Sequence, residues 1–374
     1  MVFTCNWGIL ATGGIAEQFT KDLLIDPSTR KVSDVQHRVV AVASSTSATK
    51  AQGFSKKVGC VADTKCYGSY TELVNDPDVK IIYIATPHSH HYENALQCLN
   101  AGKSILCEKP FTVNAQQTKH LVEIAREKKL FAMEAVWTRC FPLAIELQRL
   151  LFEEQIIGRI RRVHSDFGMP FDLDDVKHRL LNPDLAGGAL LDLGIYNLTW
   201  LRMTCFNDPR NEKHEPKIFS SMIKTERTGV DEFTNIALLF EKSRVNATMQ
   251  CNMTIKSDEQ AVVRIQGEQG DITVQWPPYR PTSFTVFRRE KPKTTEAALL
   301  AKQTDPGEKH EFEIPGHGHG MFWEADECAR CLRDGKLEST LVPLDESIST
   351  MTIMDTARAQ NDFRYPGTLE NVSN

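Results

Sequence analysis

The stretch WGILATGGIA, Trp7–Ala16, determines how the first part of the chain is interpreted. A short apolar run meets two glycines, Gly13 and Gly14, and a helix-like segment follows. A strand, a glycine turn and a helix N-terminus let backbone N–H groups approach a dinucleotide pyrophosphate, where the helix dipole adds partial positive charge. The pattern is G-x-G-x-x-A with Ala11 in place of the first glycine. It predicts a dinucleotide-binding loop made by Thr12, Gly13, Gly14 and Ile15.

Apolar runs and amphipathic stretches alternate through the residues that follow. The runs RVVAVAS (38–44), VKIIYIAT (79–86) and KSILCE (103–108) are apolar enough for strands buried on both faces. The segment 114–129 between later runs has the periodicity of an amphipathic helix. Strand–helix alternation of this kind predicts an α/β fold, with a doubly wound parallel sheet of the Rossmann type over residues 1–138.

The pattern then changes to strands joined by short polar turns, such as EQGD (268–271). These runs predict an open, mainly antiparallel sheet with a helix near 187–205, in a second α/β domain spanning 139–344. The C-terminal helix, about 345–374, is expected to pack back on the first domain. The polar segment 291–311 is interrupted by prolines and is interpreted as an exposed excursion.

Bulk properties narrow the class of protein. The chain has 374 residues and a net charge of −5, so charge gives no reason to expect nucleic acid or a membrane as partner. No apolar stretch reaches about 18 residues, the length that spans a bilayer. The ten cysteines are scattered, and the C-x-x-C pair Cys328 and Cys331 lacks the second ligand pair of a zinc site. We expect a cytoplasmic protein with reduced thiols and no metal.

The end of the second predicted strand bears on the choice of dinucleotide. NAD enzymes usually place an acid there to hold the ribose 2′-hydroxyl. Here residues 43–47 read ASSTS, and Lys50 follows shortly after. An acid would repel a 2′-phosphate, whereas hydroxyls and a lysine would accept one, so the sequence favours NADP. The serines can equally cap the next helix, and both interpretations can hold. The expected contacts are Ser44, Ser45 and Lys50.

The motif ATPHSHHYENAL (85–96) follows the third predicted strand. It brings Thr86, Pro87 and His88 to the carboxyl edge of the sheet, where doubly wound folds bind ligands. Its three histidines suggest a metal, but no carboxylate cluster accompanies them. Lining of the cofactor site, which would include His91, or packing at the helix start is favoured.

Two further motifs carry groups that could perform chemistry. CEKPF (107–111) places Lys109 at the same edge, where its ammonium could meet a substrate oxygen, although a turn with exposed charges has the same pattern. In the stretch 182–201, Asp192 and Tyr196 are four residues apart and share one helical face. A buried aspartate is unfavourable unless paired, and a tyrosine beside a lysine can act as a general base. The alternative is a structural ion pair with a packed tyrosine.

Together these motifs resemble the glucose–fructose oxidoreductase, inositol dehydrogenase and rhizopine catabolism (Gfo/Idh/MocA) family. The resemblance covers nearly the whole chain and includes MEAVWTR (133–139), GGALLDLGIY (187–196) and the segment 318–339. Within the family, MEAVWTR and DLGIY are similar to the branch of dimeric dihydrodiol dehydrogenases and fungal NADP-dependent D-xylose dehydrogenases. Alanine at position 11 departs from the family loop but is usual in this branch.

The resemblance implies an NADP-dependent oxidation of an aldopyranose such as D-xylose at C1, giving the lactone. It implies Lys109, Tyr196 and Asp192 as catalytic residues, with tyrosine where many members have histidine. It also implies a homodimer formed through the C-terminal sheet. A dihydrodiol or other polyol dehydrogenase is the alternative enzyme. An NADP-sensing regulator is less favoured, because a sensor can lose these three residues. The remaining expected cofactor contacts are Glu108, Trp137 and Arg139, and Trp137 and Asp166 are expected to contact the sugar.

Overall fold

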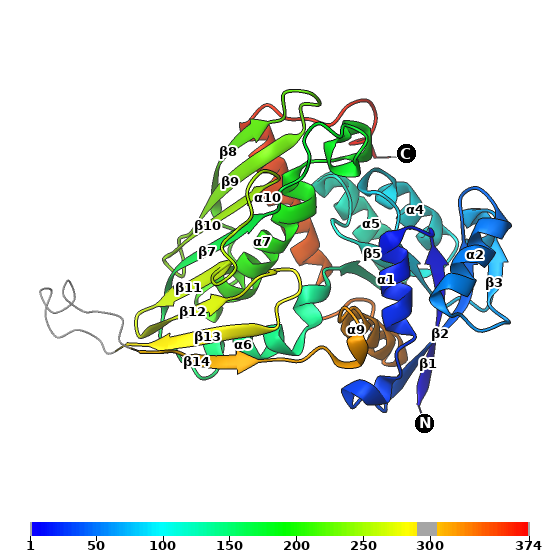
Figure 1. Ribbon diagram of the computed structural model, residues 1–374, viewed down its shortest axis with the longest axis horizontal. Coiled ribbons are helices and arrows are strands. Elements are labelled where there is room, and N and C mark those ends of the chain that lie inside the picture. The colour runs from blue at the N-terminus through cyan, green and yellow to red at the C-terminus, as the bar shows by residue number, and fades with distance from the viewer. Residues whose placement is uncertain (1, 290–304, 373–374) are drawn as a thin grey trace, which may run out of the picture.

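The computed structural model describes residues 2–289 and 305–372 and confirms the predicted α/β class. Two lobes are each built on one sheet, the first in blue and cyan and the second in green, yellow and orange (Figure 1). No helix in these two described ranges is long and apolar enough to cross a membrane.

The first sheet has six parallel strands in the order β3-β2-β1-β4-β5-β6. This is the order of a Rossmann sheet, with its switch point between β1 and β4. Every residue of β4 and β5 is buried, which explains their uninterrupted apolar sequences. The strands are β1 (Phe3–Leu10), β2 (Val35–Ala43), β3 (Lys65–Tyr67), β4 (Ile81–Ile84), β5 (Ser104–Glu108) and β6 (Ala132–Ala135).

The helices of this lobe begin at capping residues that the sequence supplies. The side chains of Ser47, Ser69 and Asn114 each accept a backbone N–H in the first turn of the helix that follows. Gly59 ends α2 with a φ of 84°, a conformation that favours glycine. The helices are α1 (Gly14–Leu23), α2 (Ala48–Val58), α3 (Tyr70–Val74), α4 (His88–Asn100) and α5 (Ala115–Glu127).

The second sheet has eight strands in the order β14-β13-β12-β11-β7-β10-β9-β8. Its pairs are antiparallel except β7 with β10, which run parallel. A π-helical turn at Leu190–Gly194 and α7 (Ile195–Leu201) pack on β7 and β10, and α6 (Pro142–Phe152) precedes the sheet. The strands are β7 (Ile160–Gly168), β8 (Lys217–Lys224), β9 (Asp231–Phe240), β10 (Val245–Asn252), β11 (Val263–Gly267), β12 (Gly270–Val274), β13 (Ser283–Arg288) and β14 (Glu308–Glu311).

The prediction that residues 291–311 form an exposed excursion is wrong for residues 308–311. Residues 308–311 form β14, which pairs with β13 at the edge of the second sheet. Its sequence, EKHE, is polar because an edge strand exposes most of its side chains. Residues 290–304 of the expected excursion lie outside the described residues.

Two C-terminal helices connect the lobes. α9 (Phe322–Arg333), within the range expected for the second domain, packs against β1, β2 and α1 of the first sheet. α10 (Leu344–Gln360) lies between α5 and β8, and its Asp355 accepts the backbone N–H of Ala115 at 2.8 Å. The helix ends at Gln360 and so covers only the first part of the expected segment 345–374.

Candidate active site

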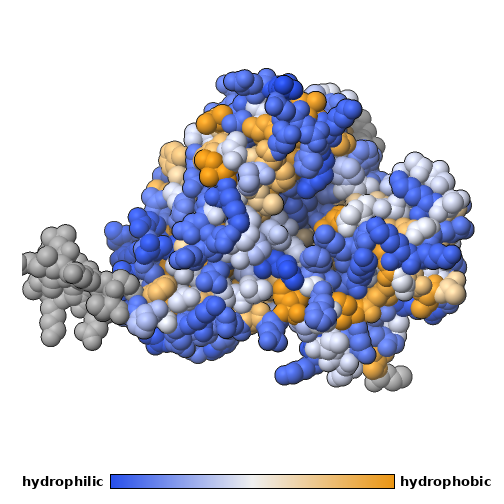
Figure 2. Space-filling view, viewed as in Figure 1, coloured by the Kyte–Doolittle hydropathy of each residue, from blue (hydrophilic) through white to orange (hydrophobic). Residues whose placement is uncertain are grey.

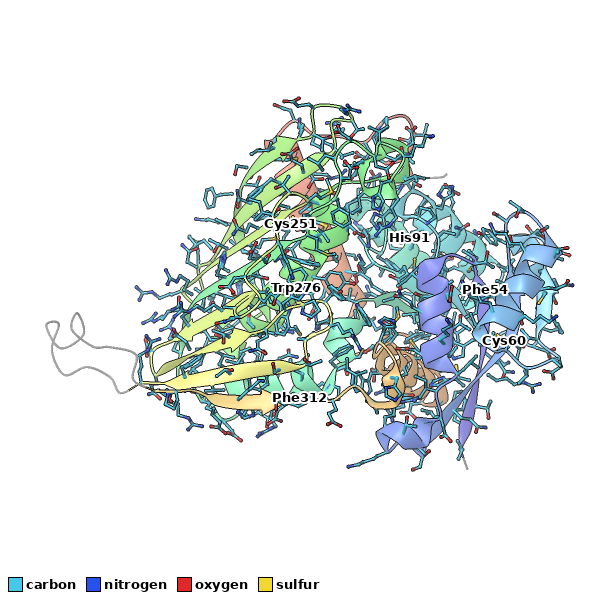
Figure 3. All side chains as sticks on the ribbon, in the orientation of Figure 1. Phe54, Cys60, His91, Cys251, Trp276 and Phe312 are labelled. Atoms are coloured by element: carbon cyan, nitrogen blue, oxygen red, sulfur yellow. The ribbon has the colours of Figure 1, made fainter. Side chains whose placement is uncertain are left out.

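A cavity of about 640 Å³ opens at the carboxyl ends of β1, β4 and β5 and reaches the inner face of the second sheet. Figure 2 shows this face of the molecule hollowed between the two lobes. In Figure 3, His91 on α4 marks the first lobe, and Trp276, beyond β12, marks the second. The expected residues that line the cavity are Gly13, Gly14, Ile15, Thr86, Pro87, His88, His91, Glu108, Lys109, Trp137, Asp192 and Tyr196.

The glycine loop forms one end of the cavity. A Cβ atom added at Gly13 or Gly14 would meet no atom within 4 Å, so both glycines border open space. Gly13 is the N-cap of α1 and supplies no side-chain cap, which leaves first-turn N–H groups available to an anion. Ala11 has a φ of 90°, in the region where glycine is preferred. This loop therefore fits a diphosphate.

Asp192 is the centre of the opposite wall. The ammonium of Lys109 donates to its backbone oxygen at 2.8 Å and to Oδ1 at 3.1 Å. Arg179 donates to both carboxylate oxygens, at 3.0 and 3.1 Å. Burial acts to raise the pKa of Asp192, but the positive charges of Lys109 and Arg179 outweigh it and hold the pKa well below its ordinary value. Asp192 is thus a fixed negative charge, and one N–H of Lys109 remains for a ligand.

Two histidines of α4 line the same region. Burial lowers the pKa of both, and that of His91 falls to about 3. His88 faces the carbonyl of Ala186 through Nδ1 at 3.1 Å and Oδ1 of Asp192 through Nε2 at 3.5 Å. A neutral imidazole donates only one hydrogen bond, and the carbonyl is the closer acceptor. Both neighbours of the ring are acceptors, so the single N–H of neutral His88 satisfies either the carbonyl of Ala186 or the carboxylate of Asp192.

The phenol of Tyr196 lies beside this cluster. Its oxygen accepts a hydrogen bond from Nε1 of Trp137 at 3.0 Å, and Nζ of Lys109 lies 4.8 Å from the ring centre. Burial and the negative charge of Glu108 raise the pKa of Tyr196 well above its ordinary value, although the Trp137 hydrogen bond acts in the opposite direction. Tyr196 is therefore a neutral phenol here, with its proton available to a ligand oxygen.

Glu108 closes the cavity at the end of β5. Its Oε1 accepts a hydrogen bond from Tyr83 and its Oε2 accepts the backbone N–H of Lys109 at 3.3 Å. Burial raises the pKa of Glu108 to about 7, against the lowering effects of Tyr83 and Lys109. Glu108 is thus the carboxyl group of the cavity whose charge changes near neutral pH.

The start of the helix that carries Asp192 is held by contacts behind the cavity. Gly188 has a φ of 118°, and a Cβ there would lie 2.0 Å from Oδ1 of Asp231. Asp231 accepts the N–H of Leu190 at 2.6 Å, and Tyr365 donates to the carbonyl of Gly187 at 2.7 Å. The glycine pair is required because neither the conformation nor the space admits a side chain.

Two residues expected to contact a ligand, Arg139 and Asp166, are not among those that line the cavity. Arg139 lies two residues after Trp137 but points away from the cavity, where its guanidinium pairs with Glu346 of α10 at 2.8 Å. Asp166 precedes Phe167, which lines the cavity, so strand alternation places it on the other face of β7.

The remaining expected cofactor contacts, Thr12, Ser44, Ser45 and Lys50, are not among the lining residues of the cavity. Ser44 is buried with its hydroxyl near that of Thr46, while Ser45 and Lys50 are exposed. Ser47 caps α2, as the alternative interpretation expected. Apart from Thr12, which belongs to the glycine loop, these residues follow β2, which pairs directly with β1, so they flank that loop at the same sheet edge.

Sequence reasoning missed several lining residues. Arg179 comes from a loop whose return to Asp192 depends on long-range packing, and its only signal is a cation close to the Gly187–Gly188 pair. An aromatic cluster forms another wall, with Tyr279 and Trp137 stacked at 6.1 Å between ring centres. The strand end at Phe167 was a usable signal for this wall. The missed residues are Gln18, Ala85, Phe167, Met169, Phe171, Arg179, Leu193, Tyr279, His319 and Met321.

Metal ligation has no support in the part of the chain that the structure describes. No group of three or more histidine, cysteine, aspartate or glutamate side chains is placed there to hold an ion. The positive groups beside Asp192 are instead Lys109 and Arg179.

Comparison with protein families divides the chain at the junction between the lobes. Residues 5–135 match the model of an oxidoreductase family with an NAD-binding Rossmann fold, and residues 146–273 match the GFO/IDH/MocA C-terminal domain. These two matches cover most of both sheets.

Similar proteins agree with this assignment. The chain is 46% identical to a D-xylose 1-dehydrogenase (NADP(+)) of Hypocrea jecorina, over 97% of this chain and 94% of that protein. It is 35% identical to a trans-1,2-dihydrobenzene-1,2-diol dehydrogenase of Bos taurus, over 96% and 98%. Two solved structures share the fold. They are a levoglucosan dehydrogenase (TM-score 0.79, 17% identity, 96% and 97% covered) and KijD10, a 3-ketoreductase from Actinomadura kijaniata (0.76, 20%, 96% and 98%).

Proposed function

The chain belongs to the GFO/IDH/MocA family of oxidoreductases, and we propose that it oxidises an aldopyranose, D-xylose, at C1 with NADP. The observation that carries this proposal is the cavity, in which a diphosphate-binding glycine loop and the Lys109–Asp192–Tyr196 group face one space. The product is the lactone, which hydrolyses to the aldonic acid.

The glycine loop and the end of β2 support NADP as the cofactor. Gly13 and Gly14 have room for a diphosphate, and the first turn of α1 offers N–H donors. Ser44, Ser45 and Lys50 follow β2 with no acid among them, which suits a 2′-phosphate. When bound, the cofactor supplies the hydride acceptor of the reaction.

Lys109 and Tyr196 orient the substrate and move its proton. Lys109 and Tyr196 line the same cavity, so the free N–H of the lysine and the O–H of the tyrosine are proposed to contact the C1 hydroxyl oxygen, while Asp192 fixes the lysine. In the lactone-forming direction Tyr196 accepts the hydroxyl proton, which requires the phenolate. The raised pKa of Tyr196 opposes this step, and the nearby groups that favour the phenolate are the N–H of Trp137 and the ammonium of Lys109.

The test is nicotinamide reduction followed by absorbance, with the purified protein and each of NADP and NAD. D-xylose, D-glucose, L-arabinose and a trans-dihydrodiol are offered in parallel. Turnover with NADP and D-xylose well above all other pairs is expected. Binding of NADP without oxidation of any sugar or diol would contradict the enzyme assignment and favour a regulator.

A trans-dihydrodiol dehydrogenase is the second candidate. The observation in its favour is the aromatic wall, since Trp137, Phe167 and Tyr279 present ring faces to the cavity. Such faces pack on the apolar face of a sugar and equally on a cyclic diene. A higher kcat/KM for the diol than for D-xylose in the same panel would select this candidate.

We also propose a cytosolic homodimer that forms through the outer face of the second sheet. Phe219 and Ile223 of β8 are 60% and 59% exposed, and Figure 2 shows apolar surface over β8 and β9. Clustered exposed apolar side chains mark interaction surfaces. Light scattering is expected to give twice the chain mass, and Phe219→Lys is expected to give monomers. A monomeric wild type would refute the dimer.

The proposed cytosolic location rests on the ten cysteines, which are all free thiols in the structure.

A further inference from the structure

Glu108 is a buried carboxyl group of the cavity that accepts hydrogen bonds but, among the described residues, forms no ion pair. Tyr83 and the N–H of Lys109 donate to its two oxygens, which suits the ionised form. No ion pair within 4 Å involves Glu108 in the described chain, whereas Asp192 pairs with both Lys109 and Arg179. A buried carboxylate whose nearest cation is paired with another acid is unfavourable unless a ligand supplies a further positive charge.

The charged and titratable groups around Glu108 come from several elements. Lys109 follows it in the chain, and their charges attract. Glu324 of α9 is wholly buried, and neither of its carboxyl oxygens has a partner. Burial and the charge of Glu108 raise the pKa of Glu324 well above its ordinary value, so Glu324 stays neutral. The other groups that interact with Glu108 are Tyr83 of β4, Cys107 of β5, Arg179, Asp192 and Tyr196.

The topology places Glu108 at the nicotinamide half of the dinucleotide site. In a sheet of this order the two halves of the cofactor lie over the two halves of the sheet. The end of β2, with Ser44, belongs to the adenosine half, and β5 belongs to the other half. This step rests on the proposed use of NADP.

We propose that Glu108 is the counter-charge of the oxidised nicotinamide ring and sets the preference of the protein for oxidised over reduced cofactor. The oxidised ring carries one positive charge and the reduced ring none, while both forms carry the same phosphates. The ratio of the two dissociation constants therefore isolates the interaction of Glu108 with the ring. During oxidation of a substrate the ring loses its charge, so Glu108 weakens binding of the product cofactor and favours its release.

The pH dependence follows from thermodynamic linkage. Burial places the pKa of Glu108 near 7 before the cofactor binds, and the positive ring lowers it. The ratio of the NADPH to the NADP⁺ dissociation constant is therefore expected to rise between pH 6 and pH 8, by about tenfold. Below this window Glu108 is protonated and the preference for NADP⁺ is lost.

The experiment measures both dissociation constants by calorimetry at pH 6, 7 and 8. Glu108→Gln is expected to bind both cofactors with a ratio that no longer changes with pH. Glu134→Gln is the matched control, because Glu134 is equally buried on β6 and accepts the N–H of Phe111 at 2.9 Å but does not line the cavity. This control is expected to keep the wild-type ratio.

A Glu108→Gln protein that keeps the pH-dependent ratio overturns the inference and leaves the proposed function intact. A wild type that binds neither cofactor overturns the proposed function and the inference with it. If Glu108→Gln does not fold, Tyr83→Phe provides the test, since loss of the Tyr83 hydrogen bond raises the pKa of Glu108. The midpoint of the ratio is then expected to move to higher pH, and an unchanged midpoint contradicts the inference.

Discussion

Two buried aspartates, Asp192 and Asp326, have the same kinds of partner in different surroundings. Asp192 in the cavity contacts Arg179 through both oxygens and has His88 at 3.5 Å. Asp326 on α9 accepts two hydrogen bonds from Arg30, each 2.7 Å, and faces His37 at 2.9 Å. The pattern of arginine, histidine and aspartate therefore does not by itself identify chemistry.

The two clusters differ in the solvent exposure of their arginines and in the number of hydrogen-bonding groups left without a partner. The side chains of Arg30 and Asp326 are 1% exposed, whereas Arg179 is 51% exposed beside the cavity. Trp7 donates to Nδ1 of His37 at 3.1 Å, so Nε2–H is the donor to Asp326 and every group is satisfied. Around Asp192, one N–H of Lys109 is left for a ligand. Unused capacity that faces a cavity marks the functional cluster.

The largest expected effect is on turnover, from Tyr196→Phe. The substitution removes the hydroxyl that we propose exchanges the substrate proton, and we expect kcat to fall by about 10²–10⁴-fold. Tyr67→Phe is the matched control, because it removes a hydroxyl hydrogen bond to Asp76, 3.1 Å long and remote from the cavity. Steady-state kinetics measure kcat for both variants and for the wild type. A Tyr196→Phe protein with wild-type kcat would contradict the role of the phenol.

The next prediction compares how much Arg30 and Arg179 each contribute to the free energy of unfolding. Arg30→Gln leaves Asp326 buried beside a neutral histidine, and we expect the free energy of unfolding to fall by about 3–5 kcal/mol. Arg179→Gln disrupts an ion pair open to solvent, so its loss of stability is expected to be below about 1 kcal/mol. Denaturant titration measures both. Equal losses would show that the two clusters have the same structural role.

The smallest effect is on the pH dependence of stability. Burial lowers the pKa of His37, so the folded protein excludes a proton that the unfolded chain binds below pH ~6.5. This stability is fully present above that pH and is lost as the pH falls. His37→Gln is expected to reduce the slope of unfolding free energy against pH below 6.5 by up to about 1.4 kcal/mol per pH unit. An unchanged slope would mean that His37 does not titrate on unfolding.

Most of the first sheet could be predicted because its strands are buried on both faces. Strands such as β4 and β5 are apolar throughout and stand between clear helices. β3 was missed because three residues give no periodicity, and β14 because an exposed edge strand has a polar sequence. Sequence patterns report burial, so elements with little burial go undetected.

The cavity could be predicted where its residues follow strand ends or glycine turns. Lys109 and Asp192 were found in this way. The sequence could not predict that Trp137 faces the cavity while Arg139 faces away from it. The local pattern does not decide this direction, because Arg139 is held by its ion pair with Glu346 of α10. Arg179 was missed for the same reason, since its contact with Asp192 depends on how a loop returns to the cavity.

The most direct test of the account is turnover and NADP binding measured on the same Lys109→Met protein. Asp192 fixes Lys109 toward the cavity, so we expect kcat to fall by about 10³-fold or more while the dissociation constant of NADP changes by less than about threefold. Retained turnover, or loss of NADP binding in a folded protein, would contradict the claim that this lysine acts on the substrate.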